Sequence, residues 1–175
     1  MEEDTMKILG YTLEQVAWIG VRLGLGWIML WAFVDKMFGL GFSTAANRAW
    51  LAGGSPTAGY LGYGTGGIFG GFYQGLAGSP EAVAIINVLF MVALLAIGVA
   101  LILGIGMRIA GYSGAVVMIL LWTTNLPPDT NPIIDDHVIY AILFLALTVV
   151  KAGQWLGLGK WWITTPFVKK VPLLE

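Results

Sequence analysis

The only histidine of this 175-residue chain, His137, directly follows Asp135 and Asp136 and precedes an apolar run. A histidine beside carboxylates can accept and release a proton near neutral pH, with one of the acids orienting the ring. Two acids at the start of a helix also stabilise that helix by capping and through its dipole. The cluster therefore indicates either a proton-handling site or a helix N-terminus, and the residues alone favour neither.

Arg22 is the second candidate, because it lies inside the first apolar run. If a helix begins at Thr12, ten residues at about 1.5 Å each place Arg22 roughly 15 Å along the axis, near the middle of a bilayer. A cation there is costly unless it is paired or hydrated. We expect Arg22 to face a bundle interior and to hold an anion or a quinone carbonyl. The alternative is a structural arginine that binds carbonyls of neighbouring helices or reaches Glu14.

Further polar side chains extend the set of candidates. A stripe at helical spacing on the fourth apolar run should face the bundle interior; it comprises His137, Tyr140, Thr148, Lys151 and Trp155. Groups able to hydrogen-bond near the outer ends of the helices are Asn87, Thr123, Thr124 and Asn125. Two cations that would attract an anion at the outer surface are Lys36 and Arg48.

Metal and redox motifs are scarce in the sequence. The chain has no cysteine, which excludes disulfides, iron–sulfur ligation and c-type haem attachment, and a single histidine excludes bis-histidine haem within one subunit. One histidine with neighbouring acids also provides too few typical ligands to indicate a metal site. The Gly62–Gly67 stretch fits G-x-G-x-x-G but lacks the βαβ context, so we interpret it as a loop and find no flavin motif. Electrons would need a bound organic carrier or another subunit.

The composition is typical of a membrane protein. Hydrophobic residues make up 58% of the chain and charged residues 11%, whereas a soluble domain is about a quarter charged. A chain of this length cannot bury so much apolar surface in its own core, so we expect a lipid bilayer as the solvent. The net charge of −1 argues against nucleic-acid binding. The acidic first residues do not fit a cleavable signal peptide.

Four apolar runs predict an all-α membrane protein, a bundle of four transmembrane helices in a single domain covering residues 1–175. The expected helices are 12–38, 81–103, 107–125 and 135–157, followed by an interfacial tail at 158–175. Thr12 and Gln15 have the form of a capping box, and Ser79-Pro80 marks the second helix start. The connection 39–80 is a long extracytoplasmic loop, with a short interfacial helix expected over 43–52.

Basic residues predict the orientation in the plasma membrane. With both termini in the cytoplasm, the inner face carries more lysine and arginine than the outer face, as the positive-inside rule requires. The inner residues are Lys7, Arg108, Lys151, Lys160, Lys169 and Lys170, and the outer ones are Lys36 and Arg48. The 39–80 loop and the His137 cluster then share the outer face.

Several short motifs occur in a characteristic order. They are Arg22-Leu23-Gly24, Gly26-Trp27, Asp35-Lys36, Trp50-Leu51, Gly59-Tyr60-Leu61, Gly104-x-Gly106-x-Arg108, Asn125 and His137. This order resembles the DoxX/DoxD family of small four-helix membrane proteins, over roughly residues 12–155. DoxD is the membrane subunit of a thiosulfate:quinone oxidoreductase and acts with a DoxA partner. The resemblance implies quinone as cofactor, a sulfur donor from the outer side and a DoxA-like second subunit. Other relatives take part in oxidative-stress complexes and assembly.

These observations support two hypotheses. In the first, the chain is the membrane subunit of a quinone-reducing oxidoreductase with thiosulfate as donor. Its quinone would contact Arg22, Tyr140, Asn125 and Lys36, while His137 exchanges protons beside Asp135 or Asp136. In the second, the chain is a non-enzymatic DoxX-like scaffold or assembly subunit, which the lack of a visible electron relay favours. A carrier or channel fits less well unless the chain forms a homo-oligomer.

Overall fold

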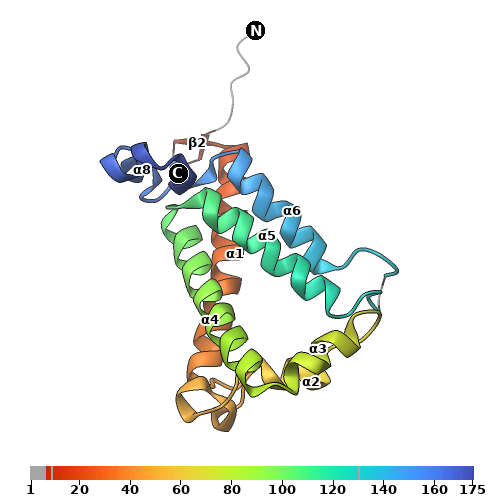
Figure 1. The fold of residues 1–175 in the computed structure, drawn as a ribbon. Coiled ribbons are helices and arrows are strands. Elements are labelled where there is room, and N and C mark those ends of the chain that lie inside the picture. Colours follow the sequence, from red (N-terminus) through yellow and green to blue (C-terminus); the bar gives the residue numbers. More distant parts are fainter. Residues whose placement is uncertain (1–6, 9, 130) are drawn as a thin grey trace.

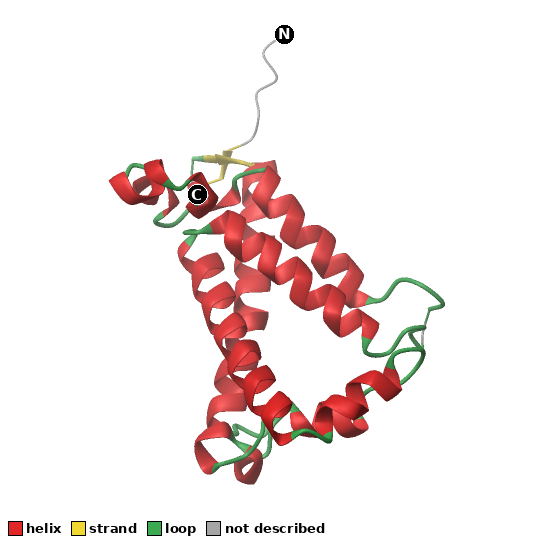
Figure 2. Cartoon of the chain, viewed as in Figure 1, coloured by secondary structure: helices red, strands yellow, loops and turns green. Residues whose placement is uncertain are grey.

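The computed structural model describes residues 7–8, 10–129 and 131–175, and it is mostly helical. Its main helices are α1 (Leu13–Phe38), α4 (Pro80–Leu103), α5 (Met107–Thr123) and α6 (Asp136–Val149). The helices α1 and α4 are long and apolar enough to cross a membrane, and α5 and α6 are shorter apolar helices. Strands in the described residues are confined to a small hairpin of β1 (Lys7–Ile8) and β2 (Tyr11–Thr12) (Figure 2). A helical protein with helices suited to a membrane is thus confirmed.

Local signals begin and end the two long helices as expected. The Thr12 hydroxyl accepts from the Gln15 backbone N–H at 3.2 Å, and the Gln15 side chain accepts from Thr12 N–H at 3.1 Å, which completes the predicted capping box. The Ser79 hydroxyl caps α4 by accepting from Ala82 N–H at 3.3 Å. Each helix ends at a glycine in the left-handed region, where residues with a Cβ are strained; for α4 it is Gly104, with φ of 75°.

The helices form two antiparallel pairs, α1 with α4 and α5 with α6 (Figure 1). The pairs meet at the end that carries residues 101–108 and 150–175, which we call the clamped end. They diverge toward the other end, formed by residues 39–79, 123–129 and 131–137, which we call the splayed end. There α2 (Ala58–Tyr63) and α3 (Gly70–Ala77) run between the start of α4 and the end of α5 (Figure 1).

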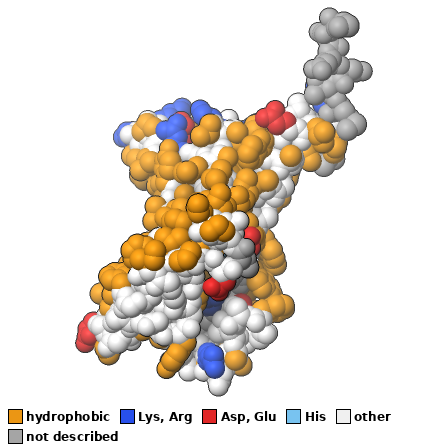
Figure 3. Space-filling view, turned by 90° about the vertical axis from the view of Figure 1, so that its right-hand side faces the viewer, with side chains coloured by type: hydrophobic (Ala, Val, Ile, Leu, Met, Phe, Trp, Pro, Cys, Tyr) orange, Lys and Arg blue, Asp and Glu red, His pale blue; other side chains and the backbone are white. Residues whose placement is uncertain are grey.

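Apolar side chains fill the space between the pairs, and small residues let the backbones approach. The buried core includes Leu25, Met29, Met91, Leu94, Met118, Phe144 and Leu147. A Cβ on Gly114 would lie 2.4 Å from a ring carbon of Phe144, so a glycine is needed there for α5 to lie close to α6. Hydrophobic side chains also cover much of the outer surface, while Lys and Arg gather at the clamped end (Figure 3). This distribution suits a membrane environment.

The fourth helix is shorter than predicted. We expected a helix over 135–157, but α6 ends at Val149, and Lys151 has a left-handed φ of 53° before the short 3₁₀ helix η3 (Ala152–Gln154). Lys151 and Trp155 therefore leave the predicted polar stripe. The chain turns because Gly153 and Gly159 pack directly against the backbone near Gly104, which a continuing helix would prevent. The prediction was wrong for this segment.

Two smaller differences concern the connections. The short helix expected over 43–52 forms two 3₁₀ helices, η1 (Ala46–Arg48) and η2 (Trp50–Ala52). The third helix ends at Thr123, so Asn125 lies beyond it. After η3 the chain continues through α7 (Gly159–Trp162), α8 (Pro166–Lys170) and η4 (Pro172–Leu174), all at the clamped end.

Candidate functional site

The His137 cluster forms a compact hydrogen-bonded unit at the splayed end. One carboxylate oxygen of Asp135 accepts the backbone N–H of His137 at 3.0 Å and that of Val138 at 3.3 Å, so Asp135 is the N-cap of α6. The other oxygen lies 2.8 Å from Nδ1 of His137. Asp135 therefore caps the helix and holds the imidazole ring at once, which joins the two interpretations that the sequence left open.

The electrostatics of the pair follow from these contacts. Burial works to raise the pKa of Asp135, but the hydrogen bonds from the His137 ring and the backbone N–H groups, together with the positive charge of the ring when protonated, lower the pKa below its ordinary value. An ionised carboxylate only accepts hydrogen bonds, so Nδ1 of His137 is the donor and Nε2 is left to exchange protons. The His137 side chain is 36% exposed, so water reaches the ring.

Asp136 plays a different part from Asp135. It is the first residue of α6 and is exposed, and within the described part of the chain no hydrogen bond joins it to the His137 ring. Its charge stabilises the positive end of the helix dipole. Tyr140, one turn further along α6, is half-buried and packs against the core. Of the two acids, only Asp135 contacts the His137 ring in the described residues.

Arg22 lies at the opposite end of the bundle from His137 and is fully buried. Nη1 donates to the carbonyl oxygens of Leu101 and Ile102, in the last turn of α4, and Nη2 donates to those of Trp155 and Leu156, after α6. The bonds to Ile102 and Trp155 are each 3.1 Å long. No carboxylate in the described residues forms an ion pair with Arg22. Carbonyl dipoles, including the negative end of the α4 dipole, balance the charge.

This geometry matches the structural alternative for Arg22. All four N–H groups of the two terminal nitrogens point toward backbone carbonyls, and only Nε is without a partner in the described residues. The guanidinium is at the level of the α4 C-terminus, so it does not stand free at mid-membrane. Because α6 is about 20 Å long at 1.5 Å per residue, Arg22 and His137 do not share one pocket.

Asn125 and Lys36 each bind a residue of the 39–80 loop. The side-chain N–H of Asn125 donates to the Gly64 carbonyl at 3.0 Å, which fixes the end of α5 to the segment after α2. Lys36 donates to the Ser43 hydroxyl at 3.4 Å, next to buried Asp35. Within the described part of the chain no hydrogen bond or ion pair connects these side chains with His137. Arg48 is exposed on η1.

The long loop is docked on the helices through Asn87, Thr123 and Thr124, which the sequence indicated as hydrogen-bonding groups without giving their partners. Tyr60 hydroxyl lies 2.7 Å from that of Thr124, and Tyr73 hydroxyl lies 2.6 Å from that of Thr123. The Asn87 side-chain oxygen accepts from Thr57 hydroxyl at 2.6 Å. The 39–80 loop is rich in glycine but also in aromatic residues, which are untypical of a disordered segment, so its composition agrees with docking but gives no partners.

Comparisons with family models, curated proteins and solved structures gave no match. The resemblance to the DoxX/DoxD family therefore depends on the motifs in the sequence. Chemically, the site offers one imidazole at a water-accessible helix end, oriented by a carboxylate at Nδ1. Such a pair can pass protons but carries no electrons.

Proposed function

We propose that the chain is a four-span plasma-membrane protein of the DoxX/DoxD type, with both termini in the cytoplasm. All four main helices carry exposed apolar side chains, as lipid contact requires. Exposed Ile133 and Ile134 before α6, and Leu156 and Leu158 after it, lengthen the apolar surface of this short helix. The basic clamped end would lie at the cytoplasmic surface, and the splayed end would face outward.

Within this framework, we propose that the chain is the membrane subunit of a quinone-reducing oxidoreductase. The observation that carries the proposal is the 2.8 Å contact between His137 Nδ1 and Asp135 at the outer end of α6. A quinone held beside His137 would supply an acceptor of two electrons and two protons, and thiosulfate, acting through a DoxA-like partner, would supply the electrons. His137 would deliver the two protons one at a time from Nε2, each replaced from outside water, while Asp135 orients the ring through its contact with Nδ1.

The other residues take supporting parts in this proposal. Tyr140 follows His137 by one turn on α6 and supplies a hydroxyl and an aromatic face next to it. Asn125 and Lys36 hold the outer loop in place through their bonds to Gly64 and Ser43. Contact between quinone and the Arg22 guanidinium would require loss of its bonds to the α4 carbonyls, so we assign Arg22 to closure of the bundle.

The test measures quinone content and turnover of the protein purified with its native lipids and co-purifying subunits. We expect isoprenoid quinone to be detected by mass spectrometry and thiosulfate to drive quinol formation. His137→Gln should slow quinol formation about a hundredfold, the usual scale of one acid–base group. Asp136→Asn is the matched control and should keep most of the activity. A folded His137→Gln protein with the wild-type rate would refute the assignment.

A scaffold or assembly subunit is the second candidate, and the Arg22 geometry favours it. A buried cation whose terminal N–H groups all bind backbone is typical of a structural role. If this function is right, other subunits co-purify with the wild-type chain, no quinone is retained, and His137→Gln changes neither observation.

A further inference from the structure

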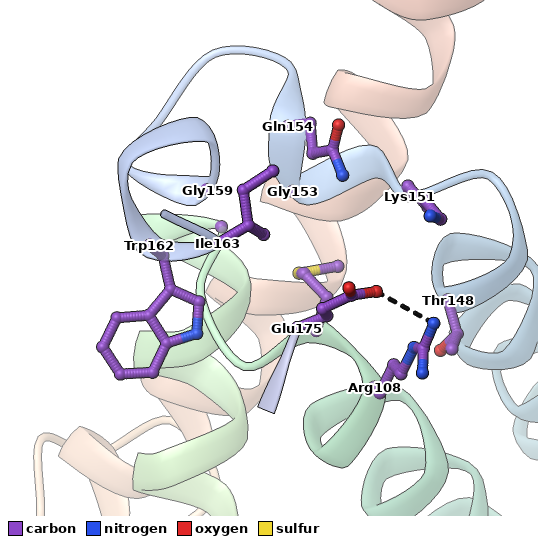
Figure 4. Close-up of a pocket in the computed structure, with 11 residues that line it drawn as sticks. Arg108, Thr148, Lys151, Gly153, Gln154, Gly159, Trp162, Ile163 and Glu175 are labelled. Atoms are coloured by element: carbon purple, nitrogen blue, oxygen red, sulfur yellow. Dashed lines mark ion pairs between the residues drawn. The ribbon is translucent and has the colours of Figure 1, made fainter. Parts of the chain in front are cut away.

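A second cluster of charged residues lines a small pocket at the clamped end, far from His137. The pocket lies between the start of α5, the end of α6 and the chain from η3 to η4. Its polar lining consists of Arg108, Thr148, Lys151, Gln154 and Glu175, with Trp162 at one side. Figure 4 shows Arg108 and Glu175 pointing toward one another, with Thr148 beside the guanidinium.

Among the side chains that line this pocket, two are cations and one is an anion. Arg108 Nη2 binds the Glu175 carboxylate at 2.9 Å, and the backbone N–H of Arg108 donates to the main-chain oxygen of Glu175 at 2.9 Å. Lys151 is the second cation and, in the described residues, pairs with no carboxylate. Lys151 is thus the lining cation with which an anionic ligand would pair.

The Glu175 carboxylate occupies the place that such a ligand would take. It binds the guanidinium through one contact, between Oε2 and Nη2, and both side chains are a little over one third exposed. An ion pair that exposed contributes little to stability and exchanges readily. The remaining pocket volume is about 20 Å³, room for one water molecule, so a phosphate group enters only if Glu175 moves aside.

The surroundings of the pocket suit a membrane surface. Exposed aromatic side chains on the neighbouring short helices are Trp161 and Phe167, and exposed lysines are Lys160, Lys169 and Lys170. Aromatic rings and lysines together are typical of segments at the headgroup level. Basic pockets between helices on the cytoplasmic side are a common form of anionic headgroup site.

We propose that this pocket binds the phosphate of an anionic lipid headgroup through Arg108 and Lys151, with Glu175 as an intrachain competitor that the phosphate displaces. The hydroxyl of Thr148 and the amide of Gln154 offer further hydrogen bonds to the phosphate oxygens. The proposal rests on the membrane placement given above but is independent of quinone chemistry.

The experiment uses the full chain, reconstituted in bilayers of equal parts phosphatidylglycerol and phosphatidylcholine and then analysed by native mass spectrometry in mild detergent. We expect wild-type protein to retain phosphatidylglycerol in preference to phosphatidylcholine. Arg108→Gln and Lys151→Gln should each reduce retention about fivefold, the effect of one cation near an anionic surface. Glu175→Gln should increase retention, since it removes the competing charge.

Lys170→Gln is the matched control, because it removes an exposed lysine at the same end that does not line the pocket. It should leave retention close to wild type. An equal loss in Lys170→Gln and Arg108→Gln, or a loss in Glu175→Gln, would overturn the proposal. Arg108→Lys keeps the positive charge but lacks the planar guanidinium, so it should retain part of the lipid binding. This variant tests the role of the charge even if Arg108→Gln fails to fold.

A free phosphate is the other source of the same chemistry. In lipid-free detergent we expect short-chain phosphatidylglycerol to raise the melting temperature in an Arg108-dependent way, and inorganic phosphate to have no such effect. An equal Arg108-dependent shift with millimolar inorganic phosphate would overturn the lipid assignment and identify a soluble phosphate ligand.

Discussion

The two ends of the bundle are held together by different means. At the clamped end, Arg22 ties α1 to two other segments of backbone, the end of α4 and residues 155–156, and glycines bring those two backbones into contact. At the splayed end, loops are tied by separate side-chain bonds such as those of Asn87 and Tyr60. Removing one group at the first end breaks several contacts together, whereas removing one at the second frees a single loop. The candidate proton-handling pair, His137 and Asp135, lies at the splayed end, where one contact can be lost without loss of the others.

The sharpest test of this contrast is Arg22→Leu. The change leaves four carbonyls at the clamped end without these donors, one of them buried and three partly buried, and we expect a loss of about 3 kcal/mol in the free energy of unfolding. Thermal unfolding of the purified protein in detergent measures it. Arg48→Gln, which removes an exposed arginine at the splayed end, should unfold like wild type. Equal melting of Arg22→Leu and wild type would contradict the contrast.

Gly159→Ala tests the backbone contacts beside Arg22. A Cβ on Gly159 would lie 2.0 Å from the carbonyl oxygen of Gly153, so the chain must shift, at a cost of about 1–3 kcal/mol. The control is Gly20→Ala in α1, where a Cβ meets no atom within 4 Å. An alanine there should stabilise the helix by about 0.5–1 kcal/mol. Melting curves should therefore move in opposite directions, and a parallel shift would count against close packing as the cause.

Asn87→Leu examines the splayed end. It removes the acceptor of the Thr57 and Ser55 bonds, and we expect a loss of about 1–2 kcal/mol confined to the loop. Hydrogen exchange should become faster over 54–64 and stay unchanged over 152–158. Val88→Leu, at the exposed neighbouring position, is the control. Faster exchange at both ends would show that the ends are coupled.

The smallest expected effect comes from Asp135→Asn. Because the folded-state pKa of Asp135 is lowered, its charge contributes stability above the ordinary aspartate pKa, and this contribution is lost as the pH falls through the folded value. Asparagine caps a helix about as well, so the variant should lose only this pH-dependent part, about 1 kcal/mol or less. Melting temperatures from neutral to acidic pH measure it, with Asp136→Asn as control. If the melting temperature of Asp135→Asn fell toward acidic pH as much as that of wild type, the result would contradict the ion pair between Asp135 and His137.

Local signals explain which helix boundaries could be predicted. Thr12 with Gln15 and Ser79 with Pro80 act within one turn, so the starts of α1 and α4 are visible in the sequence. The end of α6 is not, because the apolar run continues through Val150 with no capping residue. It is fixed by the approach of Gly153 to Gly104, two glycines far apart in the sequence.

The same distinction applies to the candidate site. His137 and its partner Asp135 are two residues apart, so their bond could be anticipated from the sequence. The partners of Arg22 are main-chain carbonyls, which every residue carries and which leave no mark on the side-chain pattern. For the same reason the sequence could not decide between a ligand-binding and a structural arginine.

Arg22 also has a consequence for the order in which the protein assembles. Its carbonyl partners lie 79 to 134 residues further along the chain, so α1 is synthesised long before the last of them exists. Until residues 155–156 are made, the cation has at most the two acceptors at the end of α4, and a cation that is only partly satisfied is costly in lipid. We therefore expect α1 to remain near water or the insertion machinery until residues 155–156 arrive. The segment that follows α6 would then complete the insertion of the first helix.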